Sequence, residues 1–328
     1  MDFPKKINLA NLPTKIEKLE KLTKEIGGPQ LFIKRDDQTG SEVSGNKIRK
    51  LEFVIQEALE QNCNYLITCG GIQSNHARAT AAAAAKLGLG AYLVLRSNEE
   101  PSLEGNYFLD KLLGAQIQFI SAEDYANKRM EIMEGLRQKL ISEGHRPYII
   151  PEGASNGIGT FGYYKAMEEI LEQEKELGIE FDAIVLPVGS GGTYSGMFLA
   201  NKIMGQKKTI YGVNVCDNAA YFKERITQIL QESLAYVNIT VDFLQEDIQI
   251  IDGYVGRGYA LSRPEELDFI HYLARVEGII LDPVYTGKAM YGLVNELKSG
   301  NIRAYKNILF IHTGGIFGLF PQKELFFK

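Results

Sequence analysis

Tryptophan is absent from this chain of 328 residues, and cysteine and histidine are scarce, with three and four residues. The cysteines, Cys63, Cys69 and Cys216, are odd in number and lack the spacing of a disulfide scaffold. We therefore expect reduced thiols in a cytoplasm-like compartment. The histidines, which stand at positions 76, 145, 271 and 312, show no spacing typical of metal ligands, so we expect no metal site.

Long hydrophobic runs are also missing, because no stretch approaches the roughly 18 apolar residues of a membrane span. The first six residues lack the apolar segment of a secretory signal peptide. The 36 Lys and Arg residues are outnumbered by 41 Asp and Glu residues, which gives a formal charge of −5, and the positive charges are scattered. These features argue against a nucleic acid or a membrane as partner and predict a soluble, cytoplasmic protein.

A glycine-loosened turn leads into a predicted helix at Ser44–Lys50. Asn46 is predicted to be the N-cap, and apolar residues recur on one helical face up to Leu59. Lys47 lies in the first turn, where the helix dipole and Lys50 both disfavour its ammonium form. Such an amine deprotonates readily and can attack a carbonyl to form a Schiff base. A solvent-exposed basic turn is the more common explanation of such a stretch, so this hypothesis needs support from elsewhere.

Strands and helices alternate along most of the chain, which is typical of parallel sheets covered by helices on both faces. An outlying helix is predicted from the spacing of the apolar residues between Ile16 and Ile26. A stretch rich in Gly, Pro, Ser and Asn, at 151–159, is predicted to be the crossing between two domains, since chains above about 250–300 residues usually divide. Strands are predicted at 31–34, 65–69, 91–95, 116–120, 148–150, 183–186, 209–215 and 307–311.

A loop of small residues at 189–193 follows a predicted strand and opens a helix. Its backbone N–H groups and the hydroxyls of Ser190 and Thr193 can converge on a phosphate, although a tight turn would have the same composition. Tyr194 stands where the dinucleotide fingerprint needs a glycine, and no nucleotide P-loop motif is present. The loop therefore predicts a site for a single phosphate; it consists of Gly189, Ser190, Gly191, Gly192 and Thr193.

Two further loops place polar side chains at predicted helix starts, where parallel sheets bind their ligands. Ser74 and Asn75 could bind a carboxylate or a phenolate-like oxygen, and simple helix capping is equally compatible with them. Tyr285 and Thr286 begin another helix, where a tyrosine more often has a packing role. No G-x-S-x-G motif indicates a serine hydrolase.

With these features the chain resembles the pyridoxal-phosphate enzymes of the tryptophan-synthase-β type. Within them it is similar to the branch that contains 1-aminocyclopropane-1-carboxylate deaminase and D-cysteine desulfhydrase. The resemblance covers nearly the whole chain and rests on the motifs Ile33-Lys34-Arg35-Asp36-Asp37, Gly45-Asn46-Lys47-Ile48-Arg49-Lys50-Leu51-Glu52, Gln73-Ser74-Asn75-His76, Gly189-Ser190-Gly191-Gly192-Thr193 and Asp282-Pro283-Val284-Tyr285.

The resemblance implies an α/β protein of fold type II, with two domains that are each an open, mostly parallel twisted sheet flanked by helices. A large cofactor-binding domain would comprise 1–47 and 159–328, and a small domain 48–158, with the active site in the cleft between them. The resemblance also implies a homodimer.

Several residue roles are implied in the same way. Lys47 would form the internal Schiff base with pyridoxal 5'-phosphate and then act as the base at the substrate Cα. The phosphate would be held by Lys50 and the 189–193 loop, and the phenolic oxygen by Asn75. Ser74 would bind the substrate carboxylate and could relay a proton. The remaining substrate contacts are implied for Gln73, His76, Tyr285 and a second active-site tyrosine, Tyr259.

Two positions distinguish the members of this branch. In the cyclopropane deaminases the residue after the Tyr285 equivalent is a glutamate and the one after the late-strand histidine is a leucine, whereas Thr286 and Thr313 stand here, as in the D-cysteine desulfhydrases. If Thr286 faces the pyridine nitrogen, its neutral hydroxyl makes the ring a weaker electron sink, which suits elimination of a good leaving group.

We therefore expect α,β-elimination from D-cysteine to pyruvate, ammonia and hydrogen sulfide. The alternatives are cyclopropane deamination, elimination from cysteate or chloroalanine, and a cofactor-binding module without turnover. The preference for D- over L-substrates follows from the resemblance alone.

Overall fold

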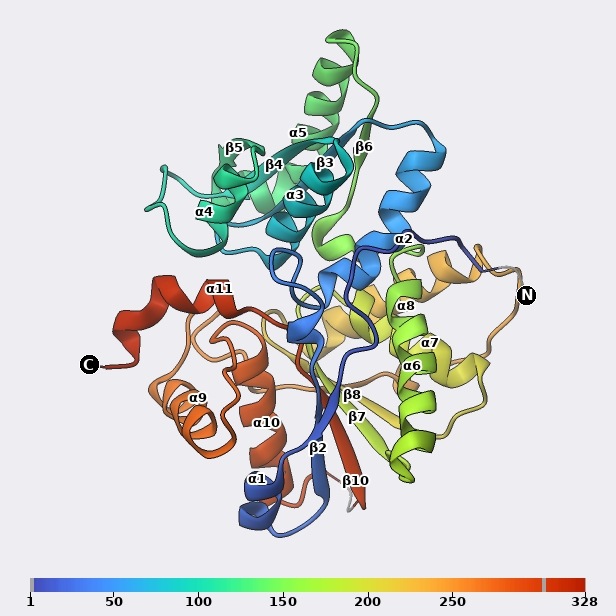
Figure 1. The fold of residues 1–328 in the computed structure, drawn as a ribbon, viewed down its shortest axis with the longest axis vertical. Helices are drawn as coiled ribbons and strands as arrows, with labels where there is room; N and C mark the ends of the chain where they lie inside the picture. Colours follow the sequence, from blue (N-terminus) through green and yellow to red (C-terminus); the bar gives the residue numbers. More distant parts are fainter. Residues whose placement is uncertain (1–2, 303–304, 328) are drawn as a thin grey trace.

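Two sheets organise the molecule, one above the other in Figure 1. The computed structural model describes residues 3–302 and 305–327. Within these ranges the larger sheet has six strands in the order β1-β2-β10-β7-β8-β9, and the smaller has four in the order β5-β4-β3-β6. The larger sheet consists of β1 (Ile16–Lys18), β2 (Gln30–Lys34), β7 (Ala183–Val188), β8 (Thr209–Asn214), β9 (Gln249–Ile251) and β10 (Asn307–Ile311), and the smaller of β3 (Tyr65–Gly71), β4 (Gly90–Arg96), β5 (Gln116–Ile120) and β6 (Pro147–Ile149).

The predicted parallel sheets are confirmed, with one exception at an edge. The strand β7 pairs in parallel with β8 and β10, and β3 pairs in parallel with β4 and β6. The edge strand β1 runs antiparallel to β2, with Ile16 opposite Lys34. The outlying helix was therefore predicted too long: Ile16 belongs to β1, and the helix begins only at Glu20.

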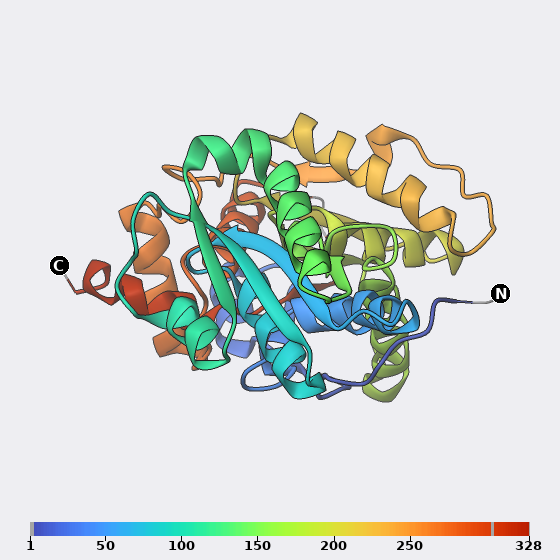
Figure 2. The same cartoon turned by 90° about the horizontal axis from the view of Figure 1, so that it is seen from above.

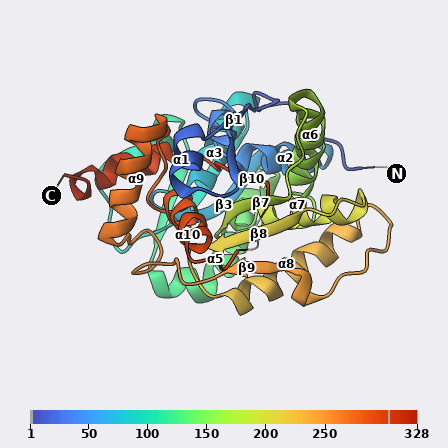
Figure 3. The same ribbon diagram turned by 90° about the horizontal axis from the view of Figure 1, so that it is seen from below.

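Helices cover both faces of the larger sheet, as Figure 3 shows from below. Alternate residues of β7 point to opposite faces. Ile184 and Leu186 pack into the hydrophobic cluster that includes α6, α7 and α8, whereas Ala183 and Val185 join the cluster of α1, α9 and α10. The helices are α1 (Glu20–Ile26), α2 (Lys47–Glu60), α3 (Asn75–Leu87), α4 (Gly105–Leu112), α5 (Ala122–Ser142), α6 (Phe161–Leu177), α7 (Gly192–Ile203), α8 (Ala219–Leu234), α9 (Pro264–Glu277), α10 (Thr286–Lys298) and α11 (Ile316–Leu319).

The smaller sheet and its helices lie over the rest of the molecule when it is seen from above (Figure 2). Helix α2 connects the two parts, because it contacts α6 beside the larger sheet and α3 beside the smaller one. A residue at the start of α2 is therefore held where the two sheets meet. No helix within the described ranges is both long enough and apolar enough to cross a bilayer.

Candidate functional site

A cavity of about 730 Å³ opens between the two sheets. Gly71 and Arg96 reach it from the carboxyl ends of β3 and β4, and Val188 from that of β7. Ligands of parallel sheets bind at such strand ends, so the loops singled out in the sequence lie in the expected place.

Most of the predicted site residues meet at this cavity, although they come from distant parts of the chain. Four of them do not appear at its wall, namely Lys50, Gln73, Gly192 and Thr286. Those that do line it are Lys47, Ser74, Asn75, His76, Gly189, Ser190, Gly191, Thr193, Tyr259, Tyr285 and Thr313.

Lys47 is the first residue of α2, and its amine has no hydrogen-bond or ion-pair partner among residues 3–302 and 305–327. Its pKa is lowered to about 8, mainly because burial disfavours the ammonium form, while Glu152 acts in the opposite direction. The pKa of Lys47 is thus lowered as predicted. The predicted causes were the helix dipole and Lys50, whereas burial is the largest cause. Asn46 holds the predicted N-cap position, but its side chain makes no capping hydrogen bond and instead donates to Thr193 Oγ1 over 2.9 Å.

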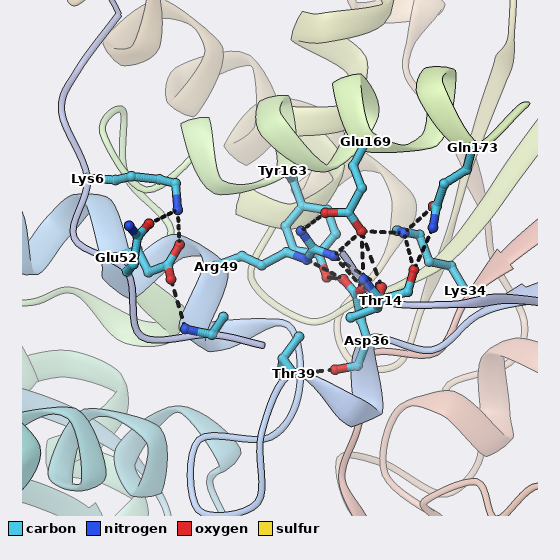
Figure 4. A network of polar contacts seen from close by, with 12 residues as sticks. Lys6, Thr14, Lys34, Asp36, Thr39, Arg49, Glu52, Tyr163, Glu169 and Gln173 are labelled. Atoms are coloured by element: carbon cyan, nitrogen blue, oxygen red, sulfur yellow. Dashed lines mark hydrogen bonds and ion pairs between the residues drawn. The ribbon is translucent and has the colours of Figure 1, made fainter. Parts of the chain in front are cut away.

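A buried ion network fixes the first turn of α2 (Figure 4). Arg49 Nε donates to Asp36 Oδ2 over 2.8 Å, and Arg49 Nη1 donates to Glu169 Oε2 over 2.9 Å. Lys34 joins through Glu169 Oε1 at 2.6 Å, and the Tyr163 hydroxyl donates to Asp36. Burial alone would raise the pKa of Asp36, but the adjacent Arg49 and Lys34 lower it to about 2. The network ties Arg49, two residues after Lys47, to β2 and α6.

The predicted phosphate loop is backed by Ser155, a residue for which no role was predicted. Its hydroxyl contacts Ser190 Oγ at 2.8 Å and the Gly192 amide at 3.3 Å. A Cβ at Gly192 would lie 2.7 Å from this hydroxyl, so only glycine fits there. Gly191, with φ of +89°, turns the chain into α7. The loop and 151–159 therefore pack tightly together.

Lys50 lies behind this loop as a fully buried cation without an acidic partner in the described ranges. Its pKa lies well below the usual value because of burial and the nearby Lys47. Arg225 of α8, which also lines the cavity, donates to the Ser155 carbonyl over 2.8 Å. A buried charge without compensation is costly, so these cations and the α7 N-terminus together fit an anion such as one phosphate group.

The start of α3 supplies a second set of polar groups. Ser74 caps the helix, since its Oγ accepts from the Ala77 amide. Asn75 Oδ1 accepts from the Asn106 side chain over 3.1 Å, which leaves the Asn75 amide nitrogen available to a ligand. The side chain of Gln73 bonds to groups away from the cavity. Its Oε1 accepts from the backbone amide of Asn106 at 2.8 Å, and its Nε2 donates to the Glu104 carbonyl.

His76 at the cavity wall is held by Thr68, whose hydroxyl lies 2.7 Å from the imidazole Nε2. Its pKa lies well below the usual value, first because of burial and then because of Lys47 and Lys50. The imidazole is therefore neutral near pH 7.

The hydroxyls of Tyr259 and Tyr285 lie 2.5 Å apart at the cavity wall. Burial is the main cause that raises the pKa of Tyr259 to about 12 and the pKa of Tyr285 well above its usual value, so both are protonated at neutral pH. A Cβ at Gly189 would come within 3.1 Å of the Tyr285 ring, so the glycine leaves room for this ring.

Thr286 does not face the cavity, contrary to the expectation from its position. Its hydroxyl donates to Asp282 Oδ1 over 2.7 Å and accepts from the Asp282 amide. Thr313 does line the cavity, and no group in the described ranges hydrogen-bonds to its hydroxyl. Of the two threonines, Thr313 is thus the one placed to meet a ligand.

Similarity to known proteins shows the family to which the chain belongs. The model of the family described as pyridoxal-phosphate dependent enzyme matches residues 7–314. A bifunctional D-cysteine desulfhydrase/1-aminocyclopropane-1-carboxylate deaminase, mitochondrial, of Arabidopsis thaliana is 44% identical over an alignment of 326 residues that covers 97% of this chain and 80% of that protein. A D-cysteine desulfhydrase of Serratia proteamaculans is 38% identical over 98% of this chain and 97% of that protein. The crystal structure of an ACC deaminase homologue matches with a TM-score of 0.90 and 39% identity, covering 98% of this chain and 95% of that one.

Proposed function

The chain belongs to the family of pyridoxal-phosphate-dependent enzymes, and from this premise we propose that it is a lyase that eliminates hydrogen sulfide from D-cysteine, with pyruvate and ammonia as the other products. The observation that carries the choice of substrate is the neutral hydroxyl of Thr313 at the cavity wall. We assign this hydroxyl to the pyridine nitrogen. A neutral partner at the nitrogen suits loss of a good leaving group rather than opening of a cyclopropane. The relative from Serratia proteamaculans is named as a D-cysteine desulfhydrase, which supports the choice, whereas the relative from Arabidopsis thaliana is named for both activities and the similar crystal structure is that of an ACC deaminase homologue.

We assign the anchoring of the cofactor to groups on both sides of the cavity. Lys47 binds the aldehyde, and Asn75 donates to the phenolic oxygen. The phosphate would be held by the 189–193 loop and Arg225, with Lys50 acting through the Ser155 hydroxyl. When bound, pyridoxal phosphate supplies the electron sink that acidifies the substrate Cα–H bond.

Proton transfer and substrate binding fall to the remaining residues. The amine of Lys47, with a pKa of about 8, takes the Cα proton near neutral pH. Ser74 and the backbone amides at the start of α3, including those of Asn75 and His76, bind the substrate carboxylate. The hydroxyl pair of Tyr259 and Tyr285 lies beside the substrate side chain and can give a proton to the departing sulfur.

The decisive experiment is turnover on D-cysteine, L-cysteine and 1-aminocyclopropane-1-carboxylate side by side. D-cysteine yields pyruvate, whereas the cyclopropane yields 2-oxobutanoate, so the keto acids identify the reaction. Formation of 2-oxobutanoate alone would refute the proposal. A second candidate is an enzyme with both activities, which the bifunctional relative from Arabidopsis thaliana favours. An enzyme with both activities should form pyruvate from D-cysteine and 2-oxobutanoate from the cyclopropane substrate.

We also propose the two-domain division at 1–47 with 159–328 and at 48–158. Its support is that all four strands of the smaller sheet fall between Tyr65 and Ile149, whereas those of the larger sheet lie outside this range. Expression of residues 48–158 alone tests it, since a domain with its own sheet should unfold in one cooperative transition.

A homodimer is the assembly we propose, and an apolar patch supports it. Helices α4 and α11 contact each other, and large apolar side chains are exposed on both helices, just before α4 and after α11. Light scattering should give a mass near twice 36.6 kDa. The change Phe320→Asp should shift it toward the monomer, and Leu177→Lys, at an exposed site on α6, should not. The exposed residues of the patch are Leu103, Phe108, Leu112, Ile316, Phe320, Leu325 and Phe327.

The compartment we propose is the cytoplasm. It is supported by Cys63, Cys69 and Cys216, which are free thiols in the structure. Cell fractionation would test it.

A further inference from the structure

Asn106 is a fully buried asparagine behind the wall of the cavity, at the second position of α4. Its Nδ2 donates to the Gln73 carbonyl over 2.9 Å and to Asn75 Oδ1 over 3.1 Å, and its Oδ1 accepts from Arg78 Nε over 3.1 Å. Asn106 itself does not line the cavity, whereas Asn75 does. It therefore acts on a ligand through Asn75.

The partners of Asn106 fix the direction in which its amide points. An arginine side chain only donates, so the oxygen of the amide faces Arg78, and a backbone carbonyl only accepts, so the nitrogen faces Gln73. The same nitrogen meets Asn75, which must present its own oxygen there. The nitrogen of the Asn75 amide then has no partner within residues 3–302 and 305–327 and is the atom left for a ligand.

The main chain of Asn106 is held as well as its side chain. The backbone N–H donates to Gln73 Oε1 over 2.8 Å. The preceding residue, Gly105, has φ of +59°, and a Cβ there would overlap Gln73 Oε1 and lie 2.6 Å from the Phe317 carbonyl oxygen, so glycine is required. Gln73, for which the resemblance implied a substrate contact, thus holds Asn106 through both its side chain and its carbonyl.

Arg78 of α3 supports the turn that leads to Lys47 in addition to Asn106. Its side chain is fully buried. Nη1 donates to the Glu42 carbonyl over 2.6 Å, and Nη2 donates to the Ser44 carbonyl over 2.9 Å. The turn before the reactive lysine and the amide beside the cavity therefore share one support, which couples their positions.

We propose that Asn106, oriented by Arg78, is a positioning residue that turns the nitrogen of the Asn75 amide toward the phenolic oxygen of pyridoxal phosphate. This inference rests on the proposed function and extends it to the residues that set the protonation of the cofactor. A donor at the phenolic oxygen favours its ionised form. If Asn75 were turned round, its oxygen would face the phenolic oxygen, and the phenolic group would have to keep its proton and donate it. Asn106 therefore favours the ionised cofactor, which absorbs visible light, over the neutral form, which absorbs in the near ultraviolet.

Asn106→Asp replaces the donor at this position by an acceptor with little change in size. The carboxylate still accepts from Arg78 but cannot donate to Asn75, whose amide should turn round. The ratio of the visible band to the near-ultraviolet band of the bound cofactor should therefore fall about tenfold. Asn106→Ala, which adds no charge, should shift the ratio in the same direction by a smaller factor, and it carries the test if the first variant does not fold.

The matched control is Asn201→Asp. Asn201 is a buried asparagine on α7 whose Nδ2 donates to the Lys208 carbonyl over 2.8 Å, and it does not line the cavity. Loss of this donor should leave the ratio of the two bands unchanged. An unchanged ratio in both variants of Asn106 would refute the inference.

Affinity supplies the second readout, measured by titrating the apoprotein with pyridoxal phosphate and with 3-deoxypyridoxal 5'-phosphate, which lacks the phenolic oxygen. Asn106→Asp should weaken binding of pyridoxal phosphate about tenfold and binding of the analogue less than about threefold. Equal losses for the two compounds would mean that Asn106 only supports the fold, which contradicts the positioning role and leaves the proposed function standing. Failure of the unaltered protein to bind either compound would overturn the proposed function as well.

Discussion

Lys50 Nζ donates to Ser155 Oγ over 3.1 Å, and this hydroxyl also lies 2.8 Å from Ser190 Oγ in the phosphate loop. The buried ammonium therefore reaches the loop through one intervening hydroxyl. A lysine in such a place costs stability in the absence of an anion and gains its compensation from the cofactor phosphate.

Replacing this lysine should separate stability from cofactor affinity. Lys50→Met removes a buried charge without an acidic partner, so the free energy of unfolding of the apoprotein should stay the same or rise. Affinity for pyridoxal phosphate should fall about tenfold, since the phosphate loses a nearby cation that acts on it through the Ser155 hydroxyl. Denaturant unfolding of the apoprotein and cofactor titration check the two parts. A large loss of apoprotein stability would contradict this account of Lys50.

The reactivity of Lys47 should follow the lowered pKa of its amine. The neutral fraction grows as pH rises toward about 8 and then levels off, whereas an ordinary lysine would continue to gain reactivity up to about 10.5. The rate at which apoprotein captures the cofactor aldehyde should therefore reach its plateau above pH 8. Stopped-flow absorbance at several pH values measures this rate.

Lys47→Ala should remove the visible absorbance band of the bound cofactor, and retention of both the band and turnover would refute the assignment of Lys47.

Local signals in the sequence predicted the regular elements well. The strands β5 and β10 were predicted with their observed limits, because short runs rich in Ile, Leu and Phe favour strands. The strand β9, with three residues, was missed, since such short segments owe their conformation to a neighbouring strand.

Long-range contacts explain what the sequence did not reveal about the site. Asn46 has a typical capping side chain, but its partner Thr193 lies 147 positions away. Arg225 stands on an amphipathic helix, where a basic residue usually faces solvent, and only the packing of α8 beside Ser155 brings it to the cavity. The composition of 151–159, rich in small polar residues, was the one available sign that this segment contributes to a site.

The ion network around Arg49 should contribute strongly to stability. Asp36→Asn leaves Arg49 and Lys34 with less negative charge in a buried place, so we expect a loss of about 3–5 kcal/mol in the free energy of unfolding. Glu172→Gln, which breaks the exposed pair with Lys175, should cost less than about 1 kcal/mol. Urea unfolding of the apoprotein measures both changes. Because the pKa of Asp36 is lowered from 3.8 to about 2, its stabilising effect is present above pH 4 and disappears as pH falls through 2.

Thr313 and Thr286 should respond differently to loss of their hydroxyls, although they are the same residue type. Thr313→Val removes a hydroxyl at the cavity wall, which we place at the pyridine nitrogen, so kcat on D-cysteine should fall about tenfold while the unfolding free energy changes little. Thr286→Val removes the bond to Asp282 Oδ1 and leaves that buried carboxylate with one donor fewer, so stability should fall by about 1–3 kcal/mol. Steady-state kinetics and urea unfolding of both variants distinguish the two effects. If Thr286→Val changed the absorbance of the bound cofactor and Thr313→Val did not, the roles would be reversed. The ring nitrogen would then have to lie against α10, where the Thr286 hydroxyl is already occupied by Asp282.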